Sequence, residues 1–256
     1  MRKAADGTSW WPRVDFFPHP AAVRVADVRG ATVVVCDVLR ATTTMIAALA
    51  AGCPRILPCA TLASARRTAA QLRADGEPCY LAGERGGLAV RGFDLGNSPL
   101  AFLNLPPKKV VLTTSNGTRA LAAAAPARRV FILSLLNLSS VCSRLASRPE
   151  KHLVLLAAGD QGRTSPEDTA VLGKLLAGLR KRSPDPQAWE KTWSREASAA
   201  YRSARGINNW TRFLVSTPHG KKISKLGFAM DVRFAGRVDS NRIVGCRSGL
   251  GIIQCK

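Results

Sequence analysis

The sequence predicts an α/β fold, with three layers (α/β/α) around a mixed, mostly parallel sheet. The prediction rests on three segments of the 256-residue chain, residues 31–52, 108–125 and 152–180. Each segment opens with a continuous apolar run, passes through a polar loop and ends in an Ala/Leu-rich stretch. Such runs are typical of strands buried on both faces, and a strand followed by a loop and a helix is the repeating unit of parallel sheets.

The remaining elements follow in chain order. Residues 56–76 predict a strand and then a helix that begins at Ser64. Residues 130–137 predict a further strand, followed by a short helix over residues 139–147. Residues 230–239 alternate between apolar and polar side chains, which favours a strand near the end of the sheet. Right-handed crossovers would put helices on both sides of this sheet.

The composition limits the class of protein. Hydrophobic residues make up 46% of the chain, which is enough for a substantial core. We expect a single domain over residues 14–256 and a poorly ordered N-terminal extension over residues 1–13. The extension lacks the apolar core of a signal peptide, and no apolar run is long enough to span a bilayer. The sequence therefore predicts a cytoplasmic protein with no membrane partner.

The seven cysteines support the same location. Their number is odd and no CxxC pair occurs, which argues against a disulfide framework and against a zinc ribbon. We expect buried, reduced thiols that pack as small hydrophobic side chains.

Charge is the least ordinary feature of the composition. The chain has 38 Lys and Arg against 17 Asp and Glu, a formal net charge of +21. A nucleic acid, an anionic membrane and a small anion all fit this charge, so charge alone does not choose among them. Trp189, Trp193, Ala197 and Tyr201 lie four residues apart among basic residues, which favours one face of an amphipathic helix that covers the sheet. Binding of single-stranded nucleic acid by the aromatic rings stays as the alternative.

The predicted sheet also locates a candidate site. In open α/β sheets, ligands bind beyond the carboxyl ends of the strands. The loops expected there are residues 37–44, 113–119 and 159–168, and each combines hydroxyl side chains with one arginine. Arginine and free helix N–H groups bind anions, while Asp37 and Asp160 supply carboxylates that can hold a divalent cation. The competing interpretation is that the hydroxyl groups only cap helices.

Two further segments carry possible site residues. Residues 79–105 are rich in glycine and contain the sequences GERGG and FDLGNSP. They match neither a P-loop nor a dinucleotide-binding fingerprint, so a hairpin and a turn form the plain interpretation. His219 precedes Gly220 in an expected turn, beside Lys221 and Lys222. It is either a structural side chain, or a phosphate ligand or proton donor.

Taken in order, the motifs resemble those of one known family. They are VVVCDVLRATTT, LAGERGG, GFDLGNSP, VVLTTSNGTRAL, SLLNLSSV, AAGDQGRTSPEDTA and, over residues 216–234, S-x-x-HG-(x)₆-GF-x-x-DV-x-F. The set is similar to that of the ComB-type 2-phosphosulfolactate phosphatases over residues 14–239, nearly the whole chain. The resemblance implies the ComB-like α/β/α fold and an Mg²⁺-dependent phosphatase. Its reaction would convert (2R)-2-phospho-3-sulfolactate to 3-sulfolactate and phosphate, a step towards coenzyme M.

The resemblance also bears on partners. The implied substrate is a small anionic molecule with phosphate, sulfonate and carboxylate groups. Nucleic-acid binding becomes secondary despite the net charge, and a homo-oligomer stays open. Two alternative functions remain: a phosphatase of another 2-phospho-hydroxyacid, and a nucleic-acid- or polyanion-binding protein on the same scaffold.

The resemblance further implies roles for individual residues. Three carboxylates would hold Mg²⁺: Asp37, Glu84 and Asp160. Four residues would carry the catalysis, the last of them by protonating the leaving alkoxide: Asp37, Arg40, Arg163 and His219. The residues around the substrate would be Thr42, Thr43, Arg85, Asn97, Ser98, Thr114, Ser115, Asn116 and Gly117. Water is preferred as the nucleophile, since no DxD signature marks Asp37 as the carboxylate that forms an acyl-phosphate.

Overall fold

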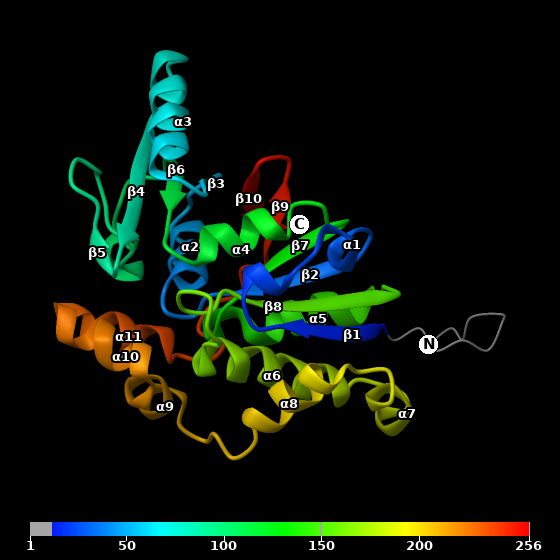
Figure 1. The fold of residues 1–256 in the computed structure, drawn as a ribbon. Coiled ribbons are helices and arrows are strands. Elements are labelled where there is room, and N and C mark those ends of the chain that lie inside the picture. Colours follow the sequence, from blue (N-terminus) through cyan, green and yellow to red (C-terminus); the bar gives the residue numbers. More distant parts are fainter. Residues whose placement is uncertain (1–11, 149, 256) are drawn as a thin grey trace.

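The computed structural model describes residues 12–148 and 150–255. Its strands form one ten-stranded sheet in the order β1-β8-β2-β7-β9-β10-β3-β6-β4-β5 (Figure 1). The strands are β1 (Arg13–Phe17), β2 (Thr32–Cys36), β3 (Ile56–Pro58), β4 (Cys79–Arg85), β5 (Leu88–Ala89), β6 (Lys109–Thr113), β7 (Arg129–Leu133), β8 (His152–Ala157), β9 (Gly245–Ser248) and β10 (Gly251–Gln254). Within the same described residues, no helix has the length and apolar character needed to cross a membrane.

Two sets of parallel strands make up most of the sheet. β1, β8, β2 and β7 run parallel to one another, and so do β3, β6 and β4. The antiparallel hairpin β9–β10 lies between β7 and β3 and joins the two sets. The predicted mixed, mostly parallel sheet is therefore confirmed. The hairpin that divides it lies in a segment for which the sequence predicts no strand.

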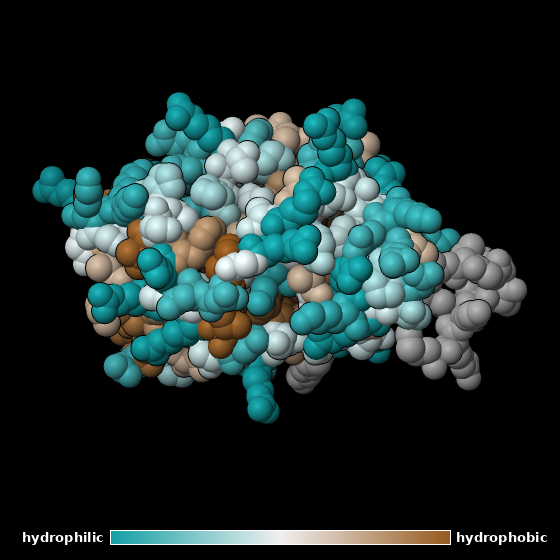
Figure 2. All heavy atoms as spheres, turned by 90° about the horizontal axis from the view of Figure 1, so that it is seen from below, coloured by the Kyte–Doolittle hydropathy of each residue, from teal (hydrophilic) through white to brown (hydrophobic). Residues whose placement is uncertain are grey.

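Helices cover both faces of the sheet and complete the three predicted layers (Figure 1). They are α1 (Val25–Val28), α2 (Ala41–Ala50), α3 (Leu62–Ala74), α4 (Gly117–Ala123), α5 (Leu138–Ser147), α6 (Pro166–Arg180), α7 (Pro186–Glu190), α8 (Arg195–Ser203), α9 (Trp210–Ser216), α10 (Pro218–Ile223) and α11 (Ala229–Ala235). On the lower side of Figure 1, Figure 2 shows hydrophilic side chains over most of the surface, with smaller hydrophobic areas between them.

The side chains of β2 explain why the apolar runs are continuous. Val33 and Val35 pack into one core together with residues of α2 and α4. Val34 and Cys36 point to the other face and pack into a second core with α5 and α6. A strand that is buried on both faces needs apolar side chains at every position. A third, smaller cluster lies under α3 on the β3–β6–β4 part of the sheet.

Two of the predicted elements differ in the structure. The strand predicted for residues 230–239 is wrong, because Ala229–Ala235 form α11. The buried residues Val232 and Ala235 are three apart, which is the spacing of one helix face rather than of a strand. Helix α3 begins at Leu62, because the Thr61 hydroxyl accepts a hydrogen bond from the Ser64 amide and caps the helix earlier than predicted.

The aromatic residues of the last quarter lie in two helices instead of one. Helix α7 ends at Glu190, and Ser194 caps the start of α8. The rings still contact each other edge to face, with centroids 5.0 Å apart for Trp189 and Trp193, and 5.4 Å apart for Trp193 and Tyr201. Both tryptophans are buried in the core beside β1, so their faces are not open for stacking with nucleic-acid bases.

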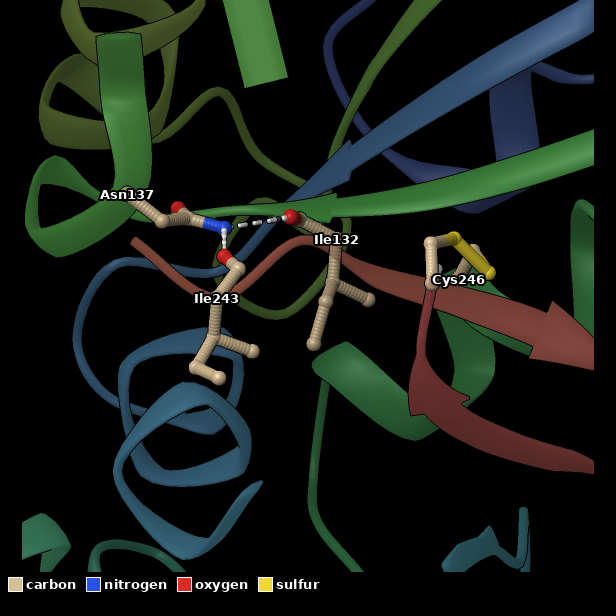
Figure 3. Close-up of a disulfide and its surroundings, with 5 residues drawn as sticks. Ile132, Asn137, Ile243 and Cys246 are labelled. Carbon is tan, nitrogen blue, oxygen red and sulfur yellow. Dashed lines mark hydrogen bonds between the residues drawn. A yellow bond between two sulfur atoms is a disulfide. The ribbon is translucent and has the colours of Figure 1, made fainter. Parts of the chain in front are cut away.

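The cysteine prediction is only partly right. Cys246 on β9 and Cys255 after β10 form a disulfide (Figure 3). The other five cysteines are free and buried, as the sequence predicts. Near the disulfide, the Asn137 side-chain amide donates hydrogen bonds to the carbonyl oxygens of Ile132, at 3.2 Å, and Ile243, at 3.0 Å (Figure 3). Asn137 thereby fastens the chain that enters β9 to the end of β7.

The N-terminal prediction falls mostly outside the described residues. Residues 1–11 lie there, so their poor order stays a prediction. Arg13, which the sequence places in the extension, is the first residue of β1, and its amide donates to the Lys151 carbonyl beside β8.

Candidate active site

The ends of several strands open into one pocket. Among its lining residues are eight that the sequence predicts for the site: Asp37, Arg40, Glu84, Asn97, Ser115, Asn116, Asp160 and His219. They come from the end of β4, from the loops after β2, β5, β6 and β8, and from α10. The structure therefore brings together both carboxylates and cations from segments that are far apart in the sequence.

The loops after β2 and β6 meet although these strands are not neighbours. β7, β9, β10 and β3 lie between them in the sheet. Helices α2 and α4, which follow β2 and β6, pack against each other and close the distance. At their contact, a Cβ atom on Gly117 would lie only 2.6 Å from Oδ2 of Asp37. Glycine is therefore required at this point, because any side chain would enter the space of the carboxylate.

Asp37 stands directly after β2 and is 7% exposed. Its Oδ1 accepts a hydrogen bond of 3.2 Å from the Ala41 amide in the first turn of α2. Burial raises the pKa of Asp37 to about 6, and the nearby Glu84 and Glu167 push it in the same direction. The neighbouring His219 acts in the opposite direction and lowers the pKa of Asp37. Asp37 thus titrates near the pH at which many enzymes work.

Glu84 acts as a clamp between two loops. Its Oε2 accepts hydrogen bonds from the Gly87 amide at 2.7 Å and the Ser115 hydroxyl at 3.2 Å. Its Oε1 accepts from the Ser115 amide at 2.6 Å. The carboxylate therefore ties the β4–β5 turn to the loop that precedes α4. Because the Ser115 donors are used in this way, they are not directed at a substrate in this structure.

His219 lies beside Asp160, the carboxylate in the loop after β8. Its Nδ1 is 3.6 Å from Oδ2 of Asp160 and makes no hydrogen bond within the described part of the chain. Asp160 Oδ1 in turn is 3.4 Å from the Asn116 amide nitrogen. His219 belongs to the first turn of α10, not to the turn predicted from its neighbour Gly220. A polar ring with an unused nitrogen in a pocket of this kind is placed for proton transfer.

Arg40 is buried and held from three sides. Its Nη1 donates to Oδ2 of Asp231 on α11 at 2.7 Å, and its Nη2 donates to the Gly87 carbonyl at 2.6 Å. The guanidinium also stacks over the Phe228 ring, 4.4 Å from its centroid. The second oxygen of Asp231 accepts from the Ser98 hydroxyl at 2.7 Å. Arg40 therefore faces the pocket in a fixed position, and its charge is paired with that of Asp231.

Several predicted site residues do not reach the pocket wall. The Thr42 hydroxyl lies 2.8 Å from the Asp37 carbonyl and 2.6 Å from the Leu133 carbonyl, and the Thr43 hydroxyl donates to the Val38 carbonyl at 2.8 Å. These hydroxyl groups hold the start of α2, as the capping interpretation expects. The others outside the wall are Thr114, Ser98, Arg85, Gly117 and Arg163.

These other residues have structural contacts or stand in solvent. Thr114 and Thr118 exchange hydrogen bonds at the start of α4. Arg85 donates to the Glu84 carbonyl and the Thr113 hydroxyl. Arg163 is exposed, and only its main chain contacts Asp160.

Four residues around the pocket have no role among those that the resemblance implies. Lys222 and Gln161 line it, Asp231 holds Arg40, and Asp168 lies behind the loop after β2. Asp168 is buried and accepts a hydrogen bond from the Val38 amide at 2.8 Å, and burial raises its pKa well above the usual range. The signals were present in the HG-x-K spacing of α10 and in the GF-x-x-DV motif. These motifs alone do not show what their side chains do, because their roles depend on the positions of α10 and α11 over the strand ends.

The oxygen atoms of the pocket could supply some of the ligands of a magnesium ion, but not a complete coordination shell. In residues 12–148 and 150–255, no three His, Cys, Asp or Glu side chains form a ready metal cluster. Asp37 and Asp160 both line the pocket, and the buried Asn97 Oδ1 has no hydrogen-bond partner among the residues that the structure describes. Mg²⁺ binds through one or two carboxylates and completes its shell with water and substrate phosphate. The hydrogen bonds of Glu84 leave it as a clamp rather than a third ligand.

The fold and the pocket define a class of protein. An α/β sheet with carboxylates, a histidine and fixed cations at its strand ends is the arrangement of an enzyme that acts on an anionic substrate. Similarity makes the class specific, because a family model for 2-phosphosulpholactate phosphatase matches residues 18–248. The chain belongs to the 2-phosphosulfolactate phosphatase family, and so to the phosphoric monoester hydrolases.

Individual relatives are similar over most of their length. A protein of Carboxydothermus hydrogenoformans is 34% identical over 227 residues, which is 89% of this chain and 90% of the relative. A protein of Deinococcus radiodurans is 32% identical over 238 residues, 91% of either chain. One of Pseudothermotoga lettingae is 31% identical over 216 residues, 82% of this chain and 87% of the relative. All three are described as probable 2-phosphosulfolactate phosphatases.

Proposed function

We propose that this chain hydrolyses 2-phospho-3-sulfolactate to 3-sulfolactate and phosphate, with Mg²⁺ as its cofactor. The observation that carries the proposal is a buried carboxylate, Asp37, in one pocket with the cationic or protonatable side chains of Arg40, His219 and Lys222. Such a pocket can bind a phosphate monoester and also move protons. The family of the chain and the names of its relatives support the same substrate.

The charges around the pocket support the need for a divalent cation. Asp37, Glu84 and Asp160 line the pocket, and Asp231 offsets the charge of Arg40 from behind. A substrate with three anionic groups would be repelled by these acids. When bound, Mg²⁺ would offset this charge and polarise the phosphoryl group. Asp37 and Asp160 are the residues that would hold it, together with the Asn97 side-chain oxygen.

The protein side chains divide the remaining work. His219 is the proton donor to the leaving alkoxide, since its ring lies in the pocket with an unused Nδ1. Arg40 keeps N–H groups beyond those bound to Asp231 and Gly87, and these would stabilise charge that develops on the transferred phosphoryl group. Water is the nucleophile in this proposal. A rapid acid quench with labelled substrate tests this step, because attack by Asp37 would leave a phosphorylated protein.

Phosphate release from synthetic 2-phospho-3-sulfolactate is the direct test of the function. We expect activity with Mg²⁺, none above background in EDTA, and recovery when Mg²⁺ is restored. Asp37→Asn should lower kcat by about 10³-fold or more, as loss of an essential charged group does. Arg119→Ala is the matched control on the exposed side of α4. An active Asp37→Asn protein, or a wild-type protein that releases no phosphate, would overturn the proposal.

The alternative substrate class is tested in the same assay. 2-Phospholactate keeps the phosphate and the carboxylate but has no sulfonate. Equal kcat/KM values for the two compounds would assign the chain to a different 2-phospho-hydroxyacid. A route to coenzyme M is part of the proposal only if deletion of the gene removes 3-sulfolactate from its host.

A cytoplasmic location is also part of this proposal. It is supported by the five free cysteines, which are all buried. The Cys246–Cys255 disulfide does not follow from a reducing compartment. Fractionation of the host cells, with the protein recovered outside the cytoplasm, would contradict it.

A further inference from the structure

The basic side chains of the pocket differ in whether an acidic side chain lies beside them. Arg40 is paired with Asp231 at 2.7 Å, and His219 lies 3.6 Å from Asp160. Lys222 also lines the pocket, but its ammonium group has no ion pair or hydrogen bond with any residue in the described part of the chain. It is the only lysine in the pocket wall, within those same residues. A positive charge held half-buried without a counter-charge is ready to meet one that a ligand brings.

Helix α10 determines where this charge lies. His219, Lys222 and Ile223 are spaced three and four residues apart, so they share the face of the helix that closes the pocket. Lys221 is the neighbour in sequence, but it is exposed and is not part of the wall. Ile223 is buried and packs in the core, which fixes the helix and limits how far Lys222 can move.

We propose that Lys222 is the specificity residue that recognises the sulfonate of the substrate. The inference rests on the proposed function, because it concerns the same pocket and the same substrate. His219 and the carboxylates of Asp37 and Asp160 are committed to the phosphoryl end, which leaves Lys222 for a group that takes no part in bond breaking. An ammonium is a compact point charge with three rotatable donors, so Lys222 can meet a sulfonate that no other free cation of the described pocket wall is placed to bind, while Arg40 is held by Asp231 and the Gly87 carbonyl and is assigned to the phosphoryl group.

The assignment makes a kinetic prediction. A charge contact to a non-reacting group supplies binding energy to the substrate that carries the group and none to an analogue without it. Lys222 should therefore set the ratio of kcat/KM for 2-phospho-3-sulfolactate over that for 2-phospholactate. It should not set the ratio for 2-phospho-3-sulfolactate over phosphoisethionate, which keeps the sulfonate and lacks the carboxylate.

The experiment compares Lys222→Met with Lys221→Met, which removes the adjacent charge outside the wall. The sulfonate ratio is kcat/KM for 2-phospho-3-sulfolactate over that for 2-phospholactate, and the carboxylate ratio is the same value over that for phosphoisethionate. We expect Lys222→Met to lower the sulfonate ratio by about 10–100-fold, the range for a charged hydrogen bond. Lys221→Met should leave the ratio within about two-fold of wild type, while Lys222→Arg should restore part of it. An unchanged sulfonate ratio in Lys222→Met, or a changed carboxylate ratio instead, would overturn the assignment.

A binding measurement separates this inference from the proposed function. Calorimetry with 3-sulfolactate and lactate needs no turnover. We expect wild type to bind 3-sulfolactate more tightly than lactate and Lys222→Met to lose the difference. Absence of phosphate release in wild type overturns the proposed function, whereas an intact preference for 3-sulfolactate in Lys222→Met overturns only the role of Lys222. Unfolding curves that match wild type confirm that the variant is folded.

Discussion

Arg40 and Asp231 form an ion pair of 2.7 Å in which the two side chains are only 2% and 3% exposed. The pair joins the loop after β2 to α11, although 191 residues separate its members. Ser98 binds the second oxygen of Asp231, and the Gly87 carbonyl binds Arg40, so four segments meet at this point. The pair therefore holds the C-terminal helices over the pocket and fixes Arg40 inside it.

Removal of Asp231 should be costly for stability. Asp231→Ala leaves the Arg40 guanidinium buried without its counter-charge, which typically costs about 3–5 kcal/mol. Urea unfolding measures the change in the free energy of unfolding. The matched control is Arg128→Ala, which breaks a pair with Glu150 whose side chains are 62% and 20% exposed, and it should cost no more than about 1 kcal/mol. Similar losses for the two variants would mean that the buried pair contributes nothing special.

Gly117 should not tolerate a side chain. The Cβ of Gly117→Ala would lie 2.6 Å from Asp37 Oδ2 and 2.5 Å from the Ala41 side chain. Overpacking of this kind costs about 1–3 kcal/mol, and the displaced carboxylate should lower kcat/KM by about 10-fold or more. Arg119→Ala on the same helix, at an exposed position, is the control for both measurements. Wild-type activity in Gly117→Ala would place the Asp37 carboxylate elsewhere.

The hydroxyl groups at the start of α2 should matter for stability and not for substrate binding. Thr43→Val removes the hydrogen bond to the Val38 carbonyl and should cost about 1–3 kcal/mol of stability with little change in KM. Asn97→Ala should behave in the opposite way, because the Asn97 Oδ1 is buried with no partner in the pocket wall. We expect it to lower kcat/KM by about 10-fold at nearly unchanged stability. A large rise in KM for Thr43→Val would return its hydroxyl to the substrate.

The sequence could predict the position of a site residue where local contacts determine it, but not where contacts between distant segments do. The positions of Asp37 and Asp160 were predictable, because an apolar run that ends in a polar residue marks the end of a buried strand. The roles of Thr42 and Thr43 were not, since a hydroxyl at a helix start can turn to the main chain or to a ligand with equal ease. Only the finished backbone shows which direction is taken.

The distant contacts were out of reach for a physical reason. Hairpin β9–β10 enters the middle of the sheet from the end of the chain, and its position depends on pairing with β7 and β3. Residues 230–239 have a pattern that fits a short strand, but their buried spacing is set by packing of α11 on α9. The roles of Asp231 and Lys222 could not be predicted, because only this packing brings them to the pocket. In the sequence, both lie far from the pocket residues at the ends of the strands.

The pH dependence of activity should report Asp37. A carboxyl with a pKa of about 6 is neutral below that pH, so it then carries no charge for binding Mg²⁺. We expect kcat/KM at low Mg²⁺ to rise with pH through about 6 and to level off above it. Higher Mg²⁺ should move this acid limb to lower pH, because the cation competes with the proton. A limb that stays in place as Mg²⁺ rises would separate Asp37 from the metal.

Asp37 should also cost the protein stability at neutral pH. Its pKa is about 6 in the folded protein against an ordinary value of 3.8, so between these values the folded state binds more protons than the unfolded state. The free energy of unfolding in EDTA should therefore fall as pH rises from about 4 to about 6, by about 2–3 kcal/mol for this group. Below that window the neutral carboxyl carries no such cost.

Asp37→Asn removes the titration without a large change in shape. Its amide oxygen can still accept the hydrogen bond from the Ala41 amide. At pH 7.5 and in EDTA, we expect this variant to unfold at a higher urea concentration than wild type, and at pH 4 the difference should shrink. Glu196→Gln, at an exposed position on α8, is the control for a general effect of lost negative charge. If wild type and Asp37→Asn follow the same pH profile, the Asp37 carboxylate is not buried at a cost, and the acid limb of activity must come from another group.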